Sequence, residues 1–257
     1  MLHGKTVVVT GVGPGLGGEV ARSVLRDGGN VVLGARNGAK LAQFAGDLDP
    51  SGTRVAHQAT DIADAEQCAA LAALAVERFG AIDGVVQVAA REVMGGLTTS
   101  DADWAAVLAA NVTGTMHVMS ATVDALGAGG GSIVIIGSQT FRTSSPRAQQ
   151  TAYAASKGAL HAAMFHLAKE LGPRRIRVNM VVPSWMWGPS VQQFVKFQAG
   201  RRGVEESVVV EEIARPMPLG EIPRVEDVAE SAVFLCSDRS RMITGQTLYV
   251  NAGNHMT

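Results

Sequence analysis

KTVVVTGVGPGLGG, at residues 5–18, places a short run of β-branched residues directly before a cluster of glycines. An uninterrupted apolar run of this kind predicts a strand buried on both faces of a parallel sheet, at residues 5–10. The glycines end that strand, and a helix-like stretch follows at residues 15–27. A strand, a glycine turn and a helix in this order are typical of the place where a doubly wound fold binds a dinucleotide.

The same alternation continues along the whole chain. Further strand-like runs lie at residues 30–35, 54–59, 84–89, 132–137, 177–182 and 246–250. Helix-like stretches lie between them at residues 39–47, 65–79, 101–126, 148–171 and 225–236. Such alternation predicts an α/β fold: a doubly wound, Rossmann-type parallel sheet of about seven strands with helices on both faces. Because no repeat or Pro-rich linker interrupts the pattern, we expect a single domain over 1–257.

Composition narrows the class of protein. Hydrophobic residues make up 47% of the chain, and the net charge is −1 with a pI near 6.6. This balance offers no electrostatic attraction to nucleic acid or to an anionic membrane. No apolar stretch approaches the ~18 residues of a membrane span, and the run at 7–9 is too short for a signal peptide, so we expect a cytoplasmic protein. Cys68, Cys236 and the histidines lack metal-ligand spacing, which predicts buried thiols and no metal site.

The glycine turn matches dinucleotide-binding fingerprints in two ways. Gly13, Gly15 and Gly18 fit G-x-G-x-x-G, whereas Gly11, Gly15 and Gly17 fit T-G-x-x-x-G-x-G. We favour the second because Gly11 directly follows the strand. Glycines permit a tight turn and a close approach of the backbone to a pyrophosphate. The first N–H groups of the following helix would attract that anion.

Three other strand ends indicate which cofactor is bound. After the second strand there is no carboxylate for a ribose 2′-hydroxyl, whereas Arg36 can receive a 2′-phosphate. This favours NADP(H), with NAD(H) and a solvated Arg36 as the alternative. Asp61 and Ile62, after the third strand, are candidates for contacting the adenine, although Asp61 can also cap the next helix. Ala89 and Ala90, after the fourth strand, are small enough to let the backbone pass close to the cofactor.

Tyr153 and Lys157 are four residues apart in a helix-like stretch, so their side chains share one face. A nearby ammonium favours the ionised form of a phenol, which would let Tyr153 exchange a proton with a carbonyl or alkoxide oxygen. Ser138 ends the fifth strand and can reach the same site. Asn111 lies beside a glycine within the 101–126 stretch. Because both residue types disfavour helix, we expect a kink there that exposes a backbone carbonyl.

The chain resembles the classical short-chain dehydrogenase/reductase family, whose motifs it matches in order at residues 10–17, Asp61, Asn111, Ser138, Tyr153, Lys157 and 243–253. The resemblance implies that Tyr153 is the general acid/base and that Ser138 orients the carbonyl and stabilises the alkoxide. It implies that Lys157 binds the nicotinamide ribose and lowers the pKa of Tyr153, and that Asn111 holds a water for a proton relay. It also implies a homotetramer and adds cofactor contacts at Gly13, Pro14, Leu16, Pro183 and Met186.

The sequence departs from the family pattern at three places. Gln-Val-Ala-Ala at residues 87–90 stands where the family has Asn-Asn-Ala-Gly, so hydrogen bonds that support the sheet are replaced or lost. Ser184 follows Pro183 in place of a glycine. Gly188 stands where the family has a threonine that contacts the nicotinamide amide. None of these changes removes a catalytic group.

The resemblance places a mobile substrate-binding lid at residues 189–218. Trp185 and Trp187, just before it, either wall an apolar pocket or pack in the core. We expect an oxidoreductase that interconverts a free ketone or aldehyde with a secondary or primary alcohol. Two alternatives stay open. One is a 3-oxoacyl-[acyl-carrier-protein] reductase, for which Arg174 and Arg175 would hold the carrier, and the other is a non-catalytic protein that senses the cofactor.

Overall fold

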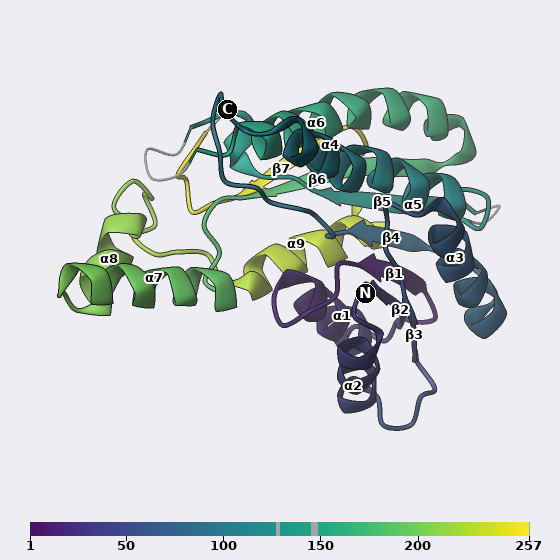
Figure 1. The fold of residues 1–257 in the computed structure, drawn as a ribbon. Coiled ribbons are helices and arrows are strands. Elements are labelled where there is room, and N and C mark those ends of the chain that lie inside the picture. Colours follow the sequence, from purple (N-terminus) through teal and green to yellow (C-terminus); the bar gives the residue numbers. More distant parts are fainter. Residues whose placement is uncertain (127–128, 145–148, 257) are drawn as a thin grey trace.

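The computed structural model describes residues 1–126, 129–144 and 149–256. In this part of the chain seven parallel strands form one sheet, in the order β3-β2-β1-β4-β5-β6-β7 (Figure 1). The strands are β1 (Thr6–Thr10), β2 (Asn30–Ala35), β3 (Val55–Ala59), β4 (Gly84–Gln87), β5 (Gly131–Ile136), β6 (Ile176–Pro183) and β7 (Thr247–Val250). Each strand end lies within two residues of its predicted position. The predicted parallel sheet is confirmed.

The strands are buried on both faces because successive side chains point to opposite sides of the sheet. Val7 and Val9 of β1 belong to the apolar cluster on one face, whereas Val8 belongs to the cluster on the other. All three side chains are fully buried. The continuous β-branched run in β1 is therefore what a sheet covered on both faces requires.

Two layers of helices cover the sheet (Figure 1). The layer that packs with Val7 and Val9 consists of α1 (Leu16–Arg26), α2 (Gly38–Leu48) and α9 (Val225–Cys236). The opposite layer includes α3 (Ala65–Phe79), α5 (Gly114–Thr122) and α6 (Thr151–Leu171). The predicted helices on both faces are confirmed. None of the described helices is both long and apolar enough to cross a membrane.

The stretch at residues 101–126 is not one helix. It comprises α4 (Asp101–Leu108), a π-helical turn over Ala109–Thr113, and α5. The expected interruption of the helix at Asn111 takes the form of this π turn, but the Asn111 carbonyl is not exposed, because it accepts a hydrogen bond from Thr115 Oγ1 at 2.6 Å. Such π turns occur often at functional sites. The predicted helix start at residue 148 lies outside the described residues.

The segment predicted as a lid, residues 189–218, contains the two helices α7 (Pro189–Arg202) and α8 (Glu206–Ala214). They form a hairpin that stands beside the sheet, at the left of Figure 1. The hairpin has its own apolar cluster, to which Val195 and Val209 belong, and Trp185 and Trp187 pack against this cluster. The ring of Trp185 lies 5.2 Å from that of Phe194. Of the two alternatives for these tryptophans, the structure favours packing.

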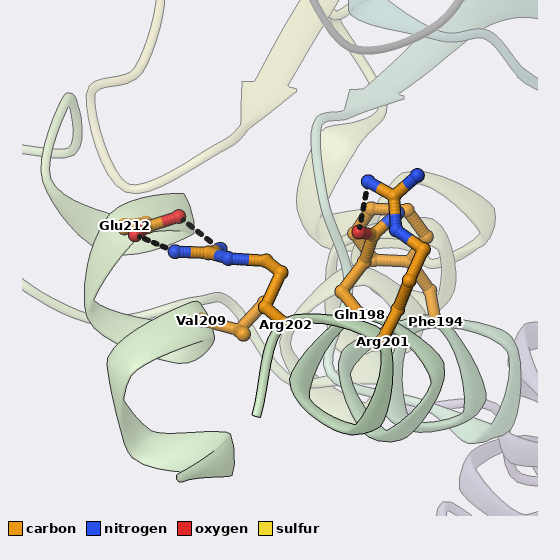
Figure 2. A pocket seen from close by; sticks show the side chains of 6 residues that line it. All are labelled: Phe194, Gln198, Arg201, Arg202, Val209 and Glu212. Atoms are coloured by element: carbon orange, nitrogen blue, oxygen red, sulfur yellow. Dashed lines mark hydrogen bonds and ion pairs between the residues drawn. The ribbon is translucent and has the colours of Figure 1, made fainter. Parts of the chain in front are cut away.

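An ion pair joins the two helices of this hairpin. Arg202 of α7 donates hydrogen bonds to both carboxylate oxygens of Glu212 in α8, at 2.7 and 2.9 Å (Figure 2). The pair borders a cavity of about 260 Å³ that is also lined by Phe194, Gln198, Arg201 and Val209. Because a bidentate pair fixes orientation as well as distance, it holds α7 and α8 together as a unit.

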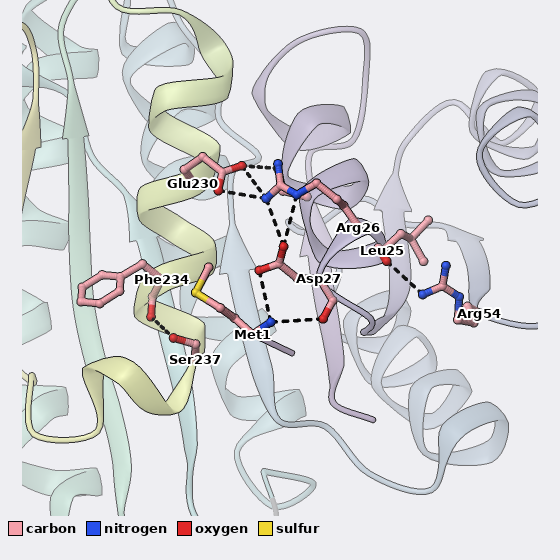
Figure 3. Close-up of polar contacts among 9 residues, drawn as sticks. Met1, Leu25, Arg26, Asp27, Arg54, Glu230, Phe234 and Ser237 are labelled. Atoms are coloured by element: carbon pink, nitrogen blue, oxygen red, sulfur yellow. Dashed lines mark hydrogen bonds and ion pairs between the residues drawn. The ribbon is translucent and has the colours of Figure 1, made fainter. Parts of the chain in front are cut away.

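Polar contacts also join α1 to α9, at the end of α1 away from the glycine turn (Figure 3). Arg26 Nη2 lies 2.7 Å from Glu230 Oε1, and Ser23 Oγ donates to the same oxygen at 3.0 Å. The hydrogen bond to Glu230 raises the pKa of Arg26. Exposed pairs of this kind add little free energy of folding. They hold α1, whose first residues follow the glycine turn, against α9.

Candidate active site

The candidate site lies where several strands end at one edge of the sheet. Because β1, β4 and β5 are parallel neighbours, the segments that follow Thr10, Gln87 and Ile136 leave from the same edge. The order of the strands reverses between β1 and β4. This is the topological switch point, the place where open α/β sheets bind their ligands.

The glycine turn needs several of its glycines for its own packing. Gly11 has a φ of +73°, and a Cβ on it would lie 2.4 Å from the backbone nitrogen of Ala89. A Cβ on Gly17 would lie 2.4 Å from the Gly11 oxygen. Both residues belong to the favoured fingerprint. Gly18, from the other fingerprint, is also sterically required, because a Cβ there would lie 2.3 Å from the Gly13 oxygen.

Two glycines of the turn are not required by packing. A Cβ on Gly13 or Gly15 would meet no atom within 4 Å. Gly15 is the N-cap residue of α1, and no side chain caps this helix. The turn therefore leaves space for an anion beside the free N–H groups at the start of α1. These residues fit the pyrophosphate of a nicotinamide dinucleotide.

The structure brings Tyr153, Ser138 and Lys157 together. Tyr153 is half-buried in the first turn of α6, and the Ser138 side chain, just after β5, forms a hydrogen bond with its hydroxyl. Lys157 lies one helical turn further on and is buried, with its Nζ 5.6 Å from the centroid of the Tyr153 ring. This Nζ donates a hydrogen bond to the Ile136 carbonyl at 2.7 Å. Thr140 Oγ1 donates to Ser138 Oγ at 3.0 Å.

The pKa values of Tyr153 and Lys157 both depart from their ordinary values. Burial raises the pKa of Tyr153 to about 12, and the negative charge of Glu92 acts in the same direction, against the hydrogen bond from Ser138. Burial lowers the pKa of Lys157 to about 8. Burial, Glu92 and Ser138 act on the pKa of Tyr153 here, and the lowering of that pKa by Lys157 stays a prediction. The Lys157 ammonium is itself desolvated, and it donates to Ile136 instead of to the phenol.

Asn111 is buried in the π turn, and its side chain joins two other parts of the site. Its Nδ2 donates to the Arg91 carbonyl and to Ser156 Oγ, both at 2.9 Å, and its Oδ1 accepts from the Arg91 nitrogen at 2.6 Å. These bonds hold the segment after β4 against α6, near Tyr153. The water that the family resemblance assigns to Asn111 stays a prediction.

At residues 87–90, where the family has Asn-Asn-Ala-Gly, the hydrogen bonds that support the sheet are replaced by those of Gln87. Gln87 is buried; its Oε1 accepts from Thr10 Oγ1, and its Nε2 donates to Thr115 Oγ1 at 3.0 Å. Thr115 in turn donates to the carbonyl of Asn111. A single glutamine thus connects β1, β4 and the π turn, so the ends of these elements stay in register around the site.

Comparison with known proteins agrees with this geometry. A family model described as enoyl-(acyl carrier protein) reductase matches residues 11–255. The chain is 32% identical to the short-chain reductase protein NovJ of Streptomyces niveus, over 97% of this chain and 93% of that protein. It is 32% identical to the D-threitol dehydrogenase of Mycolicibacterium smegmatis, over 98% and 93%. The crystal structure of L-sorbose reductase from Gluconobacter frateurii, complexed with NADPH and L-sorbose, superposes with a TM-score of 0.93 at 26% identity, over 100% of this chain and 98% of that one.

This chain belongs to the classical short-chain dehydrogenase/reductase family. It is an oxidoreductase of the short-chain type, and the similar L-sorbose reductase structure holds NADPH.

In this short-chain dehydrogenase/reductase, two basic side chains border the cavity beside the glycine turn. Neither belongs to a family motif. The cavity measures about 450 Å³ and lies between the turn, the end of β2 and α2. Its lining includes Arg22 and Lys40 as well as Gly13 and Pro14. Arg36 is exposed and is not among the lining residues. The sequence offered a signal for Lys40, because asparagine is a preferred N-cap residue and Asn37 places Lys40 in the first turn of the following helix. In the structure the Asn37 side chain caps α2 by accepting a hydrogen bond from the Lys40 nitrogen at 3.0 Å.

Asp61 forms a turn and does not cap a helix. Its Oδ1 accepts from the Ala63 nitrogen at 3.0 Å, whereas Asp64 caps α3 by accepting from two N–H groups of the first turn. The alternative that Asp61 is the cap is therefore wrong, because Asp64 stands closer to those groups. Ile62 is buried, and a Cβ on Gly114 would lie 2.9 Å from its Cγ1. Contact of Asp61 and Ile62 with an adenine stays a prediction.

The turn after β6 of this oxidoreductase contains two of the departures from the family pattern, at Ser184 and Gly188. Ser184 Oγ, next to Pro183, is buried and has no hydrogen-bond partner within the described ranges, which leaves a donor at the ligand-binding edge. Met186 is half-buried and packs against the cluster that contains Val7 and Val9. Gly188 is the N-cap residue of α7, and a Cβ there would lie 2.8 Å from Val225 Cγ1. A threonine at this position would collide with α9.

One acidic residue of the site lies outside every motif. Glu92 is exposed in the segment after β4, its charge acts on Tyr153, and its carboxylate accepts a hydrogen bond from Gln150 Nε2. Glu92 and Gln150 are 58 residues apart in the sequence. Only the folded chain brings this carboxylate to the start of α6.

Proposed function

We propose that this protein is an NADP(H)-dependent oxidoreductase that interconverts a ketone or aldehyde with a secondary or primary alcohol, with Tyr153 as the general acid/base. The observation that carries the proposal is the grouping of Tyr153, Ser138 and Lys157 at the switch-point edge of the sheet. Protonation of a carbonyl oxygen beside a nicotinamide requires a positioned phenol and a second donor, next to a turn that fits a pyrophosphate. This edge of the sheet carries both.

When bound, NADP(H) supplies or accepts the hydride. Tyr153 donates a proton to the carbonyl oxygen during reduction, and the Ser138 hydroxyl donates a hydrogen bond to the same oxygen. The raised pKa of Tyr153 suits reduction, because the phenol is protonated at neutral pH. Lys157 offers ammonium donors to the ribose hydroxyls, and a pKa of about 8 keeps most of these ammonium groups charged at neutral pH.

The charges near the glycine turn favour NADP(H) over NAD(H). Arg22 and Lys40 line the cavity beside the turn, and Arg36 follows β2. Lysine and arginine bind a 2′-phosphate through charge-assisted hydrogen bonds, whereas a 2′-hydroxyl calls for a carboxylate at the end of β2. No carboxylate stands there. The similar L-sorbose reductase structure, which holds NADPH, supports the same preference.

A free substrate is favoured over a carrier-bound thioester. Arg174 and Arg175 directly precede β6, so they lie at the amino-terminal edge of the sheet, opposite to Ser138 and Tyr153. Arg174 is also paired with Asp124 at 3.1 Å. Cations at the far edge do not suit a carrier that delivers its substrate to Tyr153. Two similar proteins carry the names of a sugar alcohol and a sugar, D-threitol and L-sorbose.

The proposal extends to the assembly and to the lid. Leu108 of α4 and Phe165 of α6 are 38% and 49% exposed. Burial of such apolar side chains against copies of the same chain would support the expected homotetramer. The α7–α8 hairpin would close over the substrate as one unit, because Arg202 and Glu212 clamp its two helices. Light scattering of the purified protein tests the assembly.

Turnover of a panel of ketones, aldehydes and alcohols with phosphorylated and unphosphorylated nicotinamide cofactors tests the function. We expect reduction with NADPH to be faster than with NADH, followed through the absorbance of the reduced nicotinamide. The matched control is Tyr153→Phe, which should bind NADPH in a fluorescence titration and reduce nothing. Cofactor binding without any turnover by the unaltered protein would favour the cofactor sensor. Turnover restricted to a 3-oxoacyl carrier thioester would favour the carrier-protein reductase.

A further inference from the structure

Glu92 lies in the segment between β4 and α4, which is fastened to the start of α6. Two backbone hydrogen bonds, of 2.8 and 3.0 Å, join Gly95 to Gln149 and Thr151. Thr151 is the first residue of α6, and Tyr153 follows it in the same turn. The fold therefore holds this segment beside the catalytic phenol.

The Glu92 carboxylate has a neutral partner and one oxygen to spare. Gln150 Nε2 donates to Glu92 Oε1. Over residues 1–126, 129–144 and 149–256, no donor binds Oε2 and no cation pairs with this carboxylate. The neighbouring Arg91 lies 3.9 Å from Asp103 instead. Although Glu92 is exposed, its partner Gln150 directly precedes α6, so the carboxylate is held at the end of the helix whose first turn carries Tyr153. Its charge also helps to raise the pKa of Tyr153.

The fold does not need this negative charge. The backbone bonds of Gly95 hold the segment whatever side chain stands at position 92, and a glutamine there could accept the same hydrogen bond from Gln150. A carboxylate also raises the proton affinity of the phenol, which does nothing for folding at neutral pH. The charge is therefore better explained by what it does to a bound substrate.

We propose that Glu92 selects the substrate: it accepts a hydrogen bond from a hydroxyl or ammonium group next to the reacting carbon and disfavours substrates that carry a carboxylate or phosphate there. Hydrogen bonds to an ionised acceptor are about twice as strong as neutral ones. Repulsion of an anion by a carboxylate acts over several ångströms. The inference rests on the proposed oxidoreductase function and names the substrate class of the same site.

Two pairs of small ketones, tested at saturating NADPH, separate the hydrogen bond to Glu92 from the repulsion of an anion. Hydroxyacetone and butanone have nearly the same shape, and only the first carries a hydroxyl. Acetoacetate and its methyl ester share a skeleton, and only the first is an anion. We expect the unaltered protein to prefer hydroxyacetone and the methyl ester, as ratios of kcat/KM.

Glu92→Gln keeps the size of the side chain and its bond to Gln150 but removes the charge. We expect the preference for hydroxyacetone to fall about tenfold and the discrimination against acetoacetate to fall about threefold to tenfold. Glu92→Asp keeps the charge, so it should retain the discrimination against acetoacetate. Glu77→Gln, on the exposed face of α3, makes the same charge change away from the site and should leave both ratios unchanged.

Each other outcome overturns the inference. Unchanged ratios in Glu92→Gln would show that the charge does not reach the substrate. An equal loss on all four ketones, with the KM for NADPH unchanged, would make Glu92 a positioning residue for Tyr153 and not a selector. Absence of turnover by the unaltered protein on these ketones and on the whole panel would overturn the proposed function itself, and this inference with it.

Discussion

The glycine turn and the Tyr153 group lie at the same edge of the sheet, yet different physical effects shape them. At the turn, backbone contacts decide which residue is possible: Gly11 and Gly17 have no room for a Cβ, whereas Gly15 has. Around Tyr153, residue identity alone does not set the proton affinities, because burial raises the pKa of Tyr153 and lowers that of Lys157. Steric requirements can be inferred from a local sequence, whereas desolvation depends on the whole fold.

The largest expected effect lies in the Tyr153 group. Tyr153→Phe removes the hydroxyl that we propose as the proton donor and keeps the ring, so we expect kcat to fall about 10³-fold or more. The fold and the affinity for NADPH should change little, as measured by circular dichroism and fluorescence titration. Residual activity within tenfold of the unaltered protein would mean that another group donates the proton.

The next effect separates the two kinds of glycine in the turn. Gly11→Ala puts a Cβ 2.4 Å from the Ala89 nitrogen at a φ of +73°, and we expect a loss of about 3 kcal/mol in the free energy of unfolding. Gly15→Ala meets no atom, so it should cost less than about 1 kcal/mol and instead weaken NADPH binding about tenfold. Urea denaturation and a binding titration measure the two quantities. Equal stability losses would contradict a division between packing and binding glycines.

Burial of Lys157 has a signature in the pH dependence of stability. Its pKa falls from 10.5 to about 8 in the folded protein, so between these values the unfolded chain holds more protons. Burial of Lys157 therefore lowers the free energy of unfolding below pH 8, and this cost disappears as the pH rises towards 10.5. Relative to Lys157→Met, the unaltered protein should gain roughly 2–3 kcal/mol over this interval.

The matched control for that measurement is Lys196→Met, at an exposed position in α7. Its stability should follow the unaltered protein at every pH. Other groups whose burial shifts a pKa in this range, the thiols of Cys68 and Cys236 and the phenol of Tyr153, are present in all three proteins and cancel in the comparison. Parallel curves for the unaltered protein and Lys157→Met would show that Lys157 is not desolvated.

The smallest effect concerns the cation beside the glycine turn. Lys40→Ala removes a charge from the lining of the cavity, and we expect the KM for NADPH to rise about fivefold to tenfold while that for NADH stays the same. Steady-state kinetics with both cofactors measures this. An equal change for both would mean that Lys40 supports the turn and does not distinguish a 2′-phosphate.

Local patterns in the sequence predicted most of the fold. Each strand is a short apolar run that ends at a turn residue, and each predicted strand lies within two residues of its position in the structure. The break at Asn111 was also predictable, because asparagine and glycine disfavour helix at that point. The two helices of the 189–218 segment were not predicted, since their apolar residues face a separate cluster that includes Trp185 and Trp187.

The parallel sheet, the glycine turn at the end of β1 and the spacing of Tyr153 and Lys157 follow from residues a few positions apart, so they can be inferred from local patterns in the chain. The environment of those residues depends on contacts that form only when distant segments fold together. Burial raises the pKa of Tyr153 and lowers that of Lys157, and Gln150 brings the charge of Glu92 to the start of α6. Desolvation and charge act through space, between residues that the chain order keeps far apart.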